Sequence, residues 1–456
     1  MPVVVSDLHL TDGTSGETIR SSAFGGFRER LRDLAYDASW RADGSYRPLE
    51  EMDIVLLGDI LDLIRSTKWL AGSARPWSDL QSPELIDKIT KINSAILDHN
   101  QTSLRILNSL VSGSTLSLPP ATNDSRPAFT SRDKPGSEDR VPIRVRLHCL
   151  VGNHDWFYHL PGPDYDRIRA QIVDALQLHN NPAVPFPHDP AESEELLSIY
   201  RAHGVFARHG DICDRLNFEE HRDASSVGDA IVVELVDRFP MAVAQELGTD
   251  LSDACARGLR EIDNVRPLVL IPVWVNGLIR RTCSRQVAKK IKEIWDRLAN
   301  DFIHLPFIND RLWTAGLFGS VAKLEWALKF SHGVSSGNLS EIANWLATKV
   351  ASPEGAFYPH AFSEPTFKSG EADFIVYGHT HHYEVVPLDV GADGLHTKIY
   401  INSGTWRAVH ELARLHISQQ EFSAYHVMTY LAFFKGDERG GRKFETWSGT
   451  LGMTLS

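Results

Sequence analysis

The chain has 456 residues, 42% of them hydrophobic, which is ample for a substantial buried core. Its formal charge is −12 at pH 7, from 47 Lys and Arg against 59 Asp and Glu, so it lacks the overall basic footprint of nucleic-acid binders. The four cysteines form no CxxC pair, which argues against a disulfide framework or a zinc–thiolate site and favours buried free thiols.

The beginning of the chain bears on its location. The first residues run directly into a polar motif, with no basic segment and long apolar core before it, so we expect no signal peptide and a cytoplasmic protein. The most apolar stretch, residues 267–275, is too short to span a bilayer and contains two prolines. We interpret it as a buried segment; a lipid-facing surface with peripheral membrane contact is the alternative.

Four short apolar runs are each followed at once by polar residues. They are residues 3–6, 53–57, 145–151 and 373–377. Such runs are typical of central strands in an α/β sheet. Because α/β folds place their chemistry at the carboxyl ends of strands, we expect the polar residues there to form a site.

Two helices are indicated in the first half of the chain. Residues 27–40 have helical spacing, and Ser82 followed by Pro83 is a signal for the start of a second helix. Residues 112–142 are rich in Ser, Pro, Gly, Asp and Arg, which predicts a flexible surface excursion. Residues 200–209 resemble a hairpin that returns to deliver a histidine.

A long helical block occupies residues 216–368. Two amphipathic stripes indicate helices there, one with Val287, Ile291, Ile294, Trp295 and Leu298, the other with Leu317, Val321, Leu324 and Leu328. We expect a cap over the site, with a remote packing domain as the alternative. Residues 398–402, 422–434 and 443–447 are predicted strands that complete a second sheet. The core is therefore residues 1–215 and 369–456.

Five polar motifs occur in a fixed order along the chain. They are Asp7-Leu8-His9, Gly58-Asp59-Ile60-Leu61-Asp62, Gly152-Asn153-His154-Asp155, His209-Gly210-Asp211 and Gly378-His379-Thr380-His381. Together they supply more imidazole and carboxylate groups than one metal ion can use. This inventory fits two adjacent divalent cations, which support in-line displacement at phosphorus, and it predicts a metal-dependent phosphoesterase.

The candidate metal ligands follow from residue chemistry. Asp7 and His9 lie two residues apart at the end of a strand, so they can converge on one cation. Asp59 follows a glycine, and its two carboxylate oxygens can bridge two cations. One amide oxygen and three imidazoles complete the set, from Asn153, His209, His379 and His381. Imidazole suits first-row metals, so we expect two divalent ions, Mn first, with Fe or Zn as alternatives.

A separate catalytic role is expected for His154. A bridged cation pair would acidify a shared water, and the resulting hydroxide would attack phosphorus in line with the leaving oxygen. His154 follows a ligand, and Asp155 beside it is expected to hydrogen-bond the imidazolium and keep it cationic. A cationic histidine can stabilise the transition state or protonate the departing alkoxide.

Several further polar residues have two interpretations each. Asp62 either orients a ligand or caps the following helix. Arg65, Lys68 and Arg407 either contact substrate phosphate, for which guanidinium is well suited, or are solvated surface groups.

In their order the motifs resemble those of the calcineurin-like metallophosphoesterases: Asp-x-His, Gly-Asp-x-x-Asp, Gly-Asn-His-Asp, a lone His and Gly-His-x-His. The resemblance covers roughly residues 1–215 and 369–456 and implies a four-layer α/β/β/α sandwich with a large helical insertion. It also implies that His154 is the catalytic histidine. The implied ligands are Asp7, His9, Asp59 and His381 for one metal and Asp59, Asn153, His209 and His379 for the other.

A narrower resemblance concerns the substrate. The runs Ser6-Asp7-Leu8-His9-Leu10 and His209-Gly210-Asp211, with Cys213-Asp214 following, are similar to the branch that contains UDP-2,3-diacylglucosamine pyrophosphohydrolases. Members of that branch also insert helices between the fourth and fifth motifs, although the insert size and residues 112–142 depart from its pattern.

These resemblances imply a small phosphorylated substrate, nucleotide or lipid-linked, with a phosphodiester, pyrophosphate or phosphomonoester bond to cleave. A metal-dependent nuclease is one alternative, and the acidic balance argues against it. A non-catalytic, metal-stabilised interaction module is the other. The sequence specifies neither the oligomeric state nor the metal pair.

Overall fold

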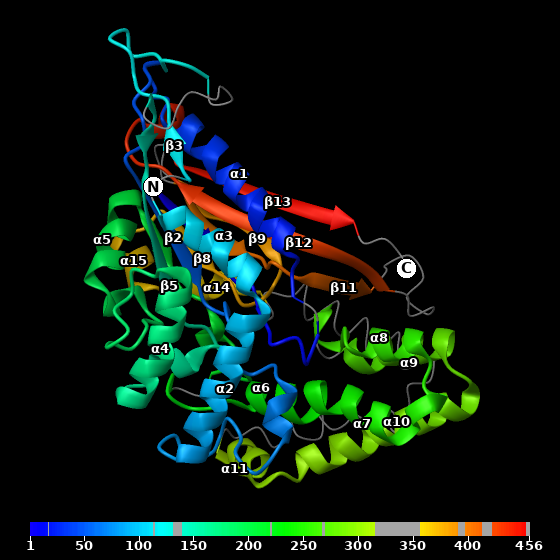
Figure 1. The fold of residues 1–456 in the computed structure, drawn as a ribbon. Coiled ribbons are helices and arrows are strands. Elements are labelled where there is room, and N and C mark those ends of the chain that lie inside the picture. Colours follow the sequence, from blue (N-terminus) through cyan, green and yellow to red (C-terminus); the bar gives the residue numbers. More distant parts are fainter. Residues whose placement is uncertain are drawn as a thin grey trace.

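The computed structural model describes residues 1–16, 18–112, 115–130, 139–218, 221–266, 270–314, 356–390, 397–412 and 422–452. These residues form a mixed α/β fold with two principal sheets and helices packed around them (Figure 1).

The larger sheet has the strand order β5-β2-β1-β12-β11-β7, and β13 pairs with β12. Its strands are β1 (Pro2–Val5), β2 (Glu51–Leu57), β5 (Arg144–Leu150), β7 (Val265–Arg266), β11 (Ala408–Leu412), β12 (Phe422–Phe433) and β13 (Phe444–Gly452). β1, β2 and β5 run parallel to one another, and β12 lies antiparallel to β1 with Ala432 beside Val3.

The second sheet has the order β6-β8-β10-β9. Its strands are β6 (Val205–Ala207), β8 (Phe374–Tyr377), β9 (Tyr383–Val390) and β10 (Thr397–Ser403). The four expected motif strands are present as β1, β2, β5 and β8. The expectation that residues 422–447 complete this second sheet is wrong, because β12 and β13 extend the first sheet beyond β1.

Alternation along β1 shows how the sheets are buried. Val3 and Val5 belong to an apolar core that also includes residues of the helices, whereas Val4 belongs to a core shared with Val376 and Ile401 of the second sheet. The two sheets therefore pack face to face, and both faces of β1 are covered, which explains its continuous apolar sequence.

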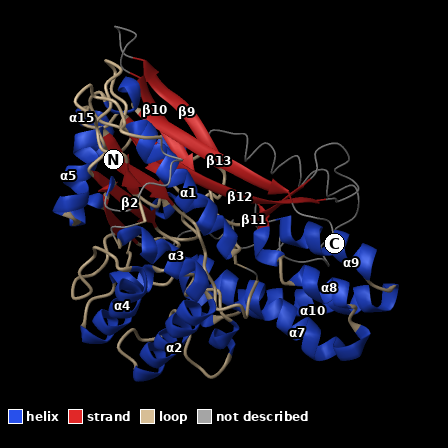
Figure 2. Cartoon of the chain, turned by 45° about the horizontal axis from the view of Figure 1, so that its top comes forward, coloured by secondary structure: helices blue, strands red, loops and turns tan. Residues whose placement is uncertain are grey.

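Helices cover the other face of the larger sheet (Figure 2). They are α1 (Ser21–Ala38), α2 (Pro83–His99), α3 (Gln101–Val111) and α4 (Pro163–Leu176). Three further helices do not belong to this layer: α5 (Glu194–His203), α14 (Tyr358–Ala361) and α15 (Pro365–Ser369). α2 begins as predicted, with the hydroxyl of Ser82 accepting a hydrogen bond from the Leu85 amide at 3.2 Å.

The expected hairpin at residues 200–209 is wrong, because the segment is a helix followed by a strand. Ser193 caps the start of α5, and Leu196 and Tyr200 bury one face of it. Gly204 then ends the helix in the left-handed conformation, with φ of +64°, and β6 follows directly.

The excursion at residues 112–142 is anchored where it is described. β3 (Ser117–Leu118) pairs with β4 (Val141–Pro142), and Leu116 and Leu118 are buried in the core. Residues 113–114 and 131–138 lie outside the described residues.

The insertion forms a second group of helices, which in Figure 1 lies below β11 and extends to α2. It contains α6 (Val227–Ile231), a π-helix (Val232–Asp237), α7 (Arg238–Leu247), α8 (Asp253–Leu259), α9 (Ile271–Thr282), α10 (Arg285–Ile303) and α11 (Pro306–Thr314). The first predicted stripe is confirmed in α10, where Ile291, Ile294, Trp295 and Leu298 are buried in a separate core. The second stripe lies outside the described residues.

The apolar stretch at residues 267–275 is buried where it is described. Its last five residues form the start of α9 and are all buried, whereas residues 267–269 lie outside the described residues. Among the described residues, no helix is both long and apolar enough to cross a membrane. The four cysteines are free, but only Cys149 and Cys255 are buried.

Candidate metal centre

The expected ligands come together because five strands end side by side. Asp7 follows β1, Asp59 follows β2, Asn153 follows β5, His209 follows β6, and the last two histidines follow β8. The first two loops are joined by backbone hydrogen bonds, from the Asp7 amide to the Gly58 carbonyl at 3.1 Å and from the His9 amide to the Asp59 carbonyl at 2.9 Å. All seven sequence-predicted ligands lie in one site.

The backbone of this site is unusual. Eight described non-glycine residues have positive φ, and five of them are predicted ligands: Asp7, His9, Asp59, His379 and His381. L-residues reach this region at a cost of about 1–3 kcal/mol each, and such conformations gather at functional sites. The left-handed backbone conformation turns these side chains inward at the ends of the strands.

Glycine is required where the loops approach one another. A Cβ atom on Gly58, whose φ is +83°, would lie 2.6 Å from Nδ1 of His209. One on Gly152 would clash with the Asp59 carboxylate. These two glycines let the backbone lie directly against the candidate ligands.

The first ligand cluster contains Asp7, His9 and His381. Nε2 of His381 lies 2.9 Å from Nε2 of His9 and 3.3 Å from Oδ1 of Asp7. The His9 nitrogen is 3.7 Å from the same carboxylate oxygen. All three side chains are buried, so three ligand atoms converge on one small enclosed volume.

The second cluster contains Asp59, Asn153, His209 and His379. Nε2 of His209 lies 3.2 Å from Oδ2 of Asp59 and 3.3 Å from Oδ1 of Asn153. Nδ1 of His379 lies 3.0 Å from that same amide oxygen. This is the second ligand set that the resemblance implies, including its neutral amide oxygen.

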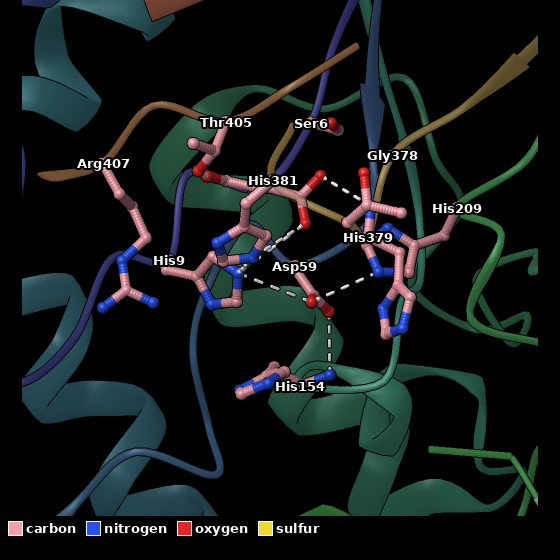
Figure 3. A network of polar contacts seen from close by, with 12 residues as sticks. Ser6, His9, Asp59, His154, His209, Gly378, His379, His381, Thr405 and Arg407 are labelled. Atoms are coloured by element: carbon pink, nitrogen blue, oxygen red, sulfur yellow. Dashed lines mark hydrogen bonds and ion pairs between the residues drawn. The ribbon is translucent and has the colours of Figure 1, made fainter. Parts of the chain in front are cut away.

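Asp59 lies between the two clusters. Its Oδ2 atom is 3.2 Å from Nε2 of His209 and 3.6 Å from Nε2 of His9, while Oδ1 accepts a hydrogen bond from the His154 amide at 2.8 Å. Figure 3 shows His9 and His381 on one side of Asp59 and His209 and His379 on the other. The carboxylate is therefore placed to bridge two cations.

In three of the four candidate ligand histidines, the second ring nitrogen has a partner that fixes the tautomer. Nδ1 of His9 lies 2.7 Å from Asp62, Nδ1 of His209 lies 2.9 Å from the Leu57 carbonyl, and Nε2 of His379 lies 3.1 Å from Asp214. Such outer partners direct the other nitrogen toward a metal.

Asp214 received no role from the sequence. It follows a short 3₁₀ turn, Asp211–Cys213, which brings it back toward His379. The only available signal was its place in the run after His209.

The structure corrects the expected partner of His154. Asp62, and not Asp155, contacts its ring, with Oδ1 2.7 Å from Nδ1. The Asp155 carboxylate instead accepts the amides of Gly152 at 2.6 Å and Ile60 at 2.8 Å, which joins two ligand-bearing loops. Asp155 is therefore a positioning residue for these loops.

The pKa values of His154 and Asp155 reflect the different surroundings of the two side chains. Burial alone would lower the pKa of His154, but the carboxylates of Asp62 and Asp59 raise it to about 9. Burial, together with the nearby charge of Asp59, raises the pKa of Asp155 to about 7.

Of the two interpretations of Asp62, the orienting one is supported and the helix cap is wrong. The two oxygens of Asp62 contact His9 and His154, so this carboxylate orients a candidate ligand and the candidate catalytic histidine together. The following 3₁₀ helix, Thr67–Leu70, is capped by Ser66, whereas Asp62 accepts the amide of Arg65 in the preceding loop at 3.0 Å.

The site brings buried carboxylates and imidazoles into close contact. Burial raises the pKa of Asp7 and Asp59, but the surrounding histidines outweigh this and hold both pKa values well below the usual range. The same carboxylates raise the pKa of buried His209 well above its ordinary value. Buried charges of this density need compensation by protons or by metal ions.

Arg65 and Arg407 are not solvated. Both are almost fully buried, and they share one partner from the insertion, Asp263, at 3.0 Å and 2.8 Å. Arg407 also donates to Asn264 at 2.7 Å. Lys68 is paired with Asp12 at 2.5 Å. All three cations are thus held by protein carboxylates.

The insertion is attached directly beside the site. Arg222 contacts Asp211 at 2.5 Å and donates to the Gly152 carbonyl at 3.1 Å. Trp156 Nε1 donates to Asp229 of α6 at 3.2 Å. The helical group therefore contacts the same loops that carry the ligands.

The comparisons with known proteins add no family assignment: no family model matches the chain, and no match was found among curated proteins.

Proposed function

We propose that the chain is a dinuclear-metal-dependent phosphoesterase of the calcineurin-like kind, which hydrolyses a phosphodiester, pyrophosphate or phosphomonoester bond. The observation that carries the proposal is the position of Asp59 Oδ2, which is shared between two ligand clusters. One carboxylate oxygen reaching two sets of imidazoles is the arrangement that a two-metal site requires.

The residues present fit two divalent cations. Oδ1 of Asp7 is buried and has no hydrogen-bond partner, although it lies beside two imidazole nitrogens. The Nε2 atoms of His9 and His381 face each other at 2.9 Å, where two lone pairs would repel unless a proton or a cation lies near both. Mixed imidazole, carboxylate and amide donors suit Mn, Fe or Zn. Bound cations would supply Lewis acidity, which acidifies water and neutralises phosphoryl oxygens.

His154 is the residue that we propose acts on the substrate. Its Nδ1 atom is engaged by Asp62, so Nε2 is the nitrogen that can hold a proton toward a bound phosphoryl group. Its ring packs edge-on against His9 with centroids 4.7 Å apart, which places it next to the first cluster. Its side chain is 13% exposed, against 1% for that of His9, so it is the group that a substrate can reach. In this position it donates a proton to the leaving oxygen.

The fold is consistent with this assignment. The two face-to-face sheets, with helices outside the larger one and an outer apolar cluster that includes Phe357 and Tyr358 on the smaller one, support a four-layer α/β/β/α sandwich. The insertion helices would serve as a cap, because Asp229 and Asp263 reach residues next to the ligand loops. A cap of this kind favours a small phosphorylated substrate, nucleotide or lipid-linked, over nucleic acid.

The test uses Mn-loaded protein and three substrates: p-nitrophenyl phosphate, bis-p-nitrophenyl phosphate and a nucleotide-sugar pyrophosphate. We expect hydrolysis of at least one, with loss of about 10²-fold or more in Asp59→Asn, because this change weakens the shared ligand. Equal rates in the wild type and Asp59→Asn would contradict the proposal.

The matched control is Asp53→Asn, which alters a carboxylate on the same strand at the end remote from the site, beside Arg146. This control is expected to keep full activity. Absence of hydrolysis of all three substrates by wild type with two bound metals would favour a non-catalytic module.

A further inference from the structure

A second group of metal-binding side chains lies outside the centre described above. It consists of His159, His188 and Glu192, each with one ligand atom within 4.8 Å of the others. Nδ1 of His188 is 2.9 Å from Oε1 of Glu192, and Nε2 of His159 is 3.5 Å from Oε2. The imidazole rings are perpendicular, with centroids 5.0 Å apart. None of these residues belongs to a sequence motif.

The backbone holds these residues in place. His159 ends the short 3₁₀ helix Trp156–His159, which begins directly after the Asn153-His154-Asp155 segment. The Phe186 amide donates to the Tyr158 carbonyl at 3.0 Å, and this bond brings the next segment alongside. That segment turns in a second 3₁₀ helix, Pro190–Glu192, capped by Asp189. The ligand atoms are therefore positioned by ordered backbone.

An outer carboxylate completes the arrangement. Oδ1 of Asp223 lies 2.6 Å from Nδ1 of His159, which directs Nε2 of that ring toward Glu192. A carboxylate on the far nitrogen of a histidine is the usual companion of a metal ligand. Nδ1 of His188 is buried and makes no hydrogen bond, although it lies close to Glu192. The nitrogen and the carboxylate oxygen are therefore close enough to bind one cation together.

We propose that His159, His188 and Glu192 bind a divalent transition-metal ion, with zinc as the best match and Asp223 orienting His159. Two imidazoles and one carboxylate form a ligand set that zinc uses, with a fourth position left for water. The side chains of His159 and His188 are 18% and 22% exposed, so solvent and metal reach the site. The site differs from the first centre in every ligand.

The position of the site suggests its role. His159 follows the loop that carries Asn153 and His154, whereas Asp223 belongs to the first loop of the insertion. The neighbouring Arg222 contacts Asp211 and the Gly152 carbonyl. Through Asp223, which orients His159, a cation here links the first loop of the insertion to the loop of the proposed catalytic histidine.

The test measures zinc per chain by elemental analysis after chelation, zinc loading and desalting. We expect His188→Ala and Glu192→Gln each to hold one zinc ion fewer than the wild type. The difference of one is expected whatever the first centre binds, so this test is independent of the proposed phosphoesterase activity. Glu192→Gln conserves side-chain size, so its result stands even if His188→Ala folds poorly.

The matched control is His179→Ala, which removes a histidine that is paired with a glutamate but belongs to no metal-binding group among the described residues. Nε2 of His179 lies 3.1 Å from Glu195, and both side chains are more than 40% exposed. This variant is expected to keep the wild-type zinc content. Equal zinc in the wild type, His188→Ala and Glu192→Gln, or equal loss in His179→Ala, would overturn the proposal.

Discussion

The buried carboxylate of Asp62 contacts the partly exposed ring of His154, with Oδ1 2.7 Å from Nδ1. The second oxygen of Asp62 is equally close to Nδ1 of His9. One carboxylate thus positions a proposed proton donor and a candidate ligand. The geometry of the proposed catalysis and that of the proposed metal binding are coupled through this side chain.

Asp62→Asn is expected to lower kcat by about 10–100-fold, the usual cost of removing an outer carboxylate from a metal site. The amide cannot accept protons from both rings as a carboxylate does. Steady-state kinetics and metal analysis on the same sample test this. Because Asp62 is a positioning residue, the effect should be mainly on kcat, and a change in KM alone would contradict it.

His154→Ala is expected to retain both metals and to lose about 10²–10⁴-fold in turnover, the range for a general acid. Its ring lies beside the ligand clusters, and its backbone amide, which the substitution keeps, donates to Asp59. Elemental analysis and kinetics measure the two effects separately. Loss of a metal ion in this variant would show that the ring is a ligand.

Asp263→Ala is expected to destabilise the protein by about 3–5 kcal/mol, because it leaves two buried guanidinium groups without their shared partner. Urea unfolding at pH 7 measures the change. The control is Glu246→Ala, whose exposed pairing with Arg297 should contribute about 0–1 kcal/mol. Comparable losses in the two variants would mean that the buried triad of Arg65, Arg407 and Asp263 is not a principal link between insertion and core.

The buried triad also changes the expectation for deletion of the insertion. If the insertion acted only as a cap, removing residues 220–365 would mainly alter substrate choice. Because that deletion removes Asp263 and strand β7 of the larger sheet, we expect it to destabilise the core as well. Point substitutions on the insertion are therefore the better probe of specificity.

The free energy of unfolding is expected to fall on acidification because His203 becomes protonated. Burial and nearby positive charge lower the pKa of this histidine to about 4, and its Nδ1 donates to the Ile199 carbonyl at 2.7 Å. Since the ordinary pKa is about 6.5, the contribution is complete above that pH and is lost between about 6.5 and 4. We expect a loss of about 1–2 kcal/mol at pH 5 relative to pH 7.5.

Urea unfolding of the wild type and His203→Gln at the two pH values tests this, because the variant lacks the titrating group. The variant should lose less stability than the wild type on acidification. An identical pH dependence in the two proteins would contradict the assignment.

The ligands could be predicted from the sequence because each follows an apolar strand, and parallel strands end at one edge of a sheet. The partner of His154 could not, since Asp155 and Asp62 are both plausible until the loop conformation is known. Asp155 points to the Gly152 and Ile60 amides because the loop folds back on itself. The residue next to His154 in the sequence, Asp155, is therefore not the residue that contacts its ring.

Long-range pairings were the other limit of prediction. Strand β12 was correctly located, but its sheet depends on the register that places Ala432 beside Val3, which no local pattern encodes. The ion pairs of Arg65 and Arg407 with Asp263 likewise depend on how the insertion packs against the rest of the chain. The cluster at His159, His188 and Glu192 gave no recognisable spacing at all.

Electron paramagnetic resonance of the Mn-loaded protein tests whether Asp59 joins two metal ions through one carboxylate. Oδ2 of Asp59 lies 3.6 Å from Nε2 of His9 and 3.2 Å from Nε2 of His209. We expect the spectrum of a magnetically coupled Mn pair in the wild type and its loss in Asp59→Asn. A spectrum of isolated Mn ions in the fully loaded wild type would show that Asp59 does not bridge two metals.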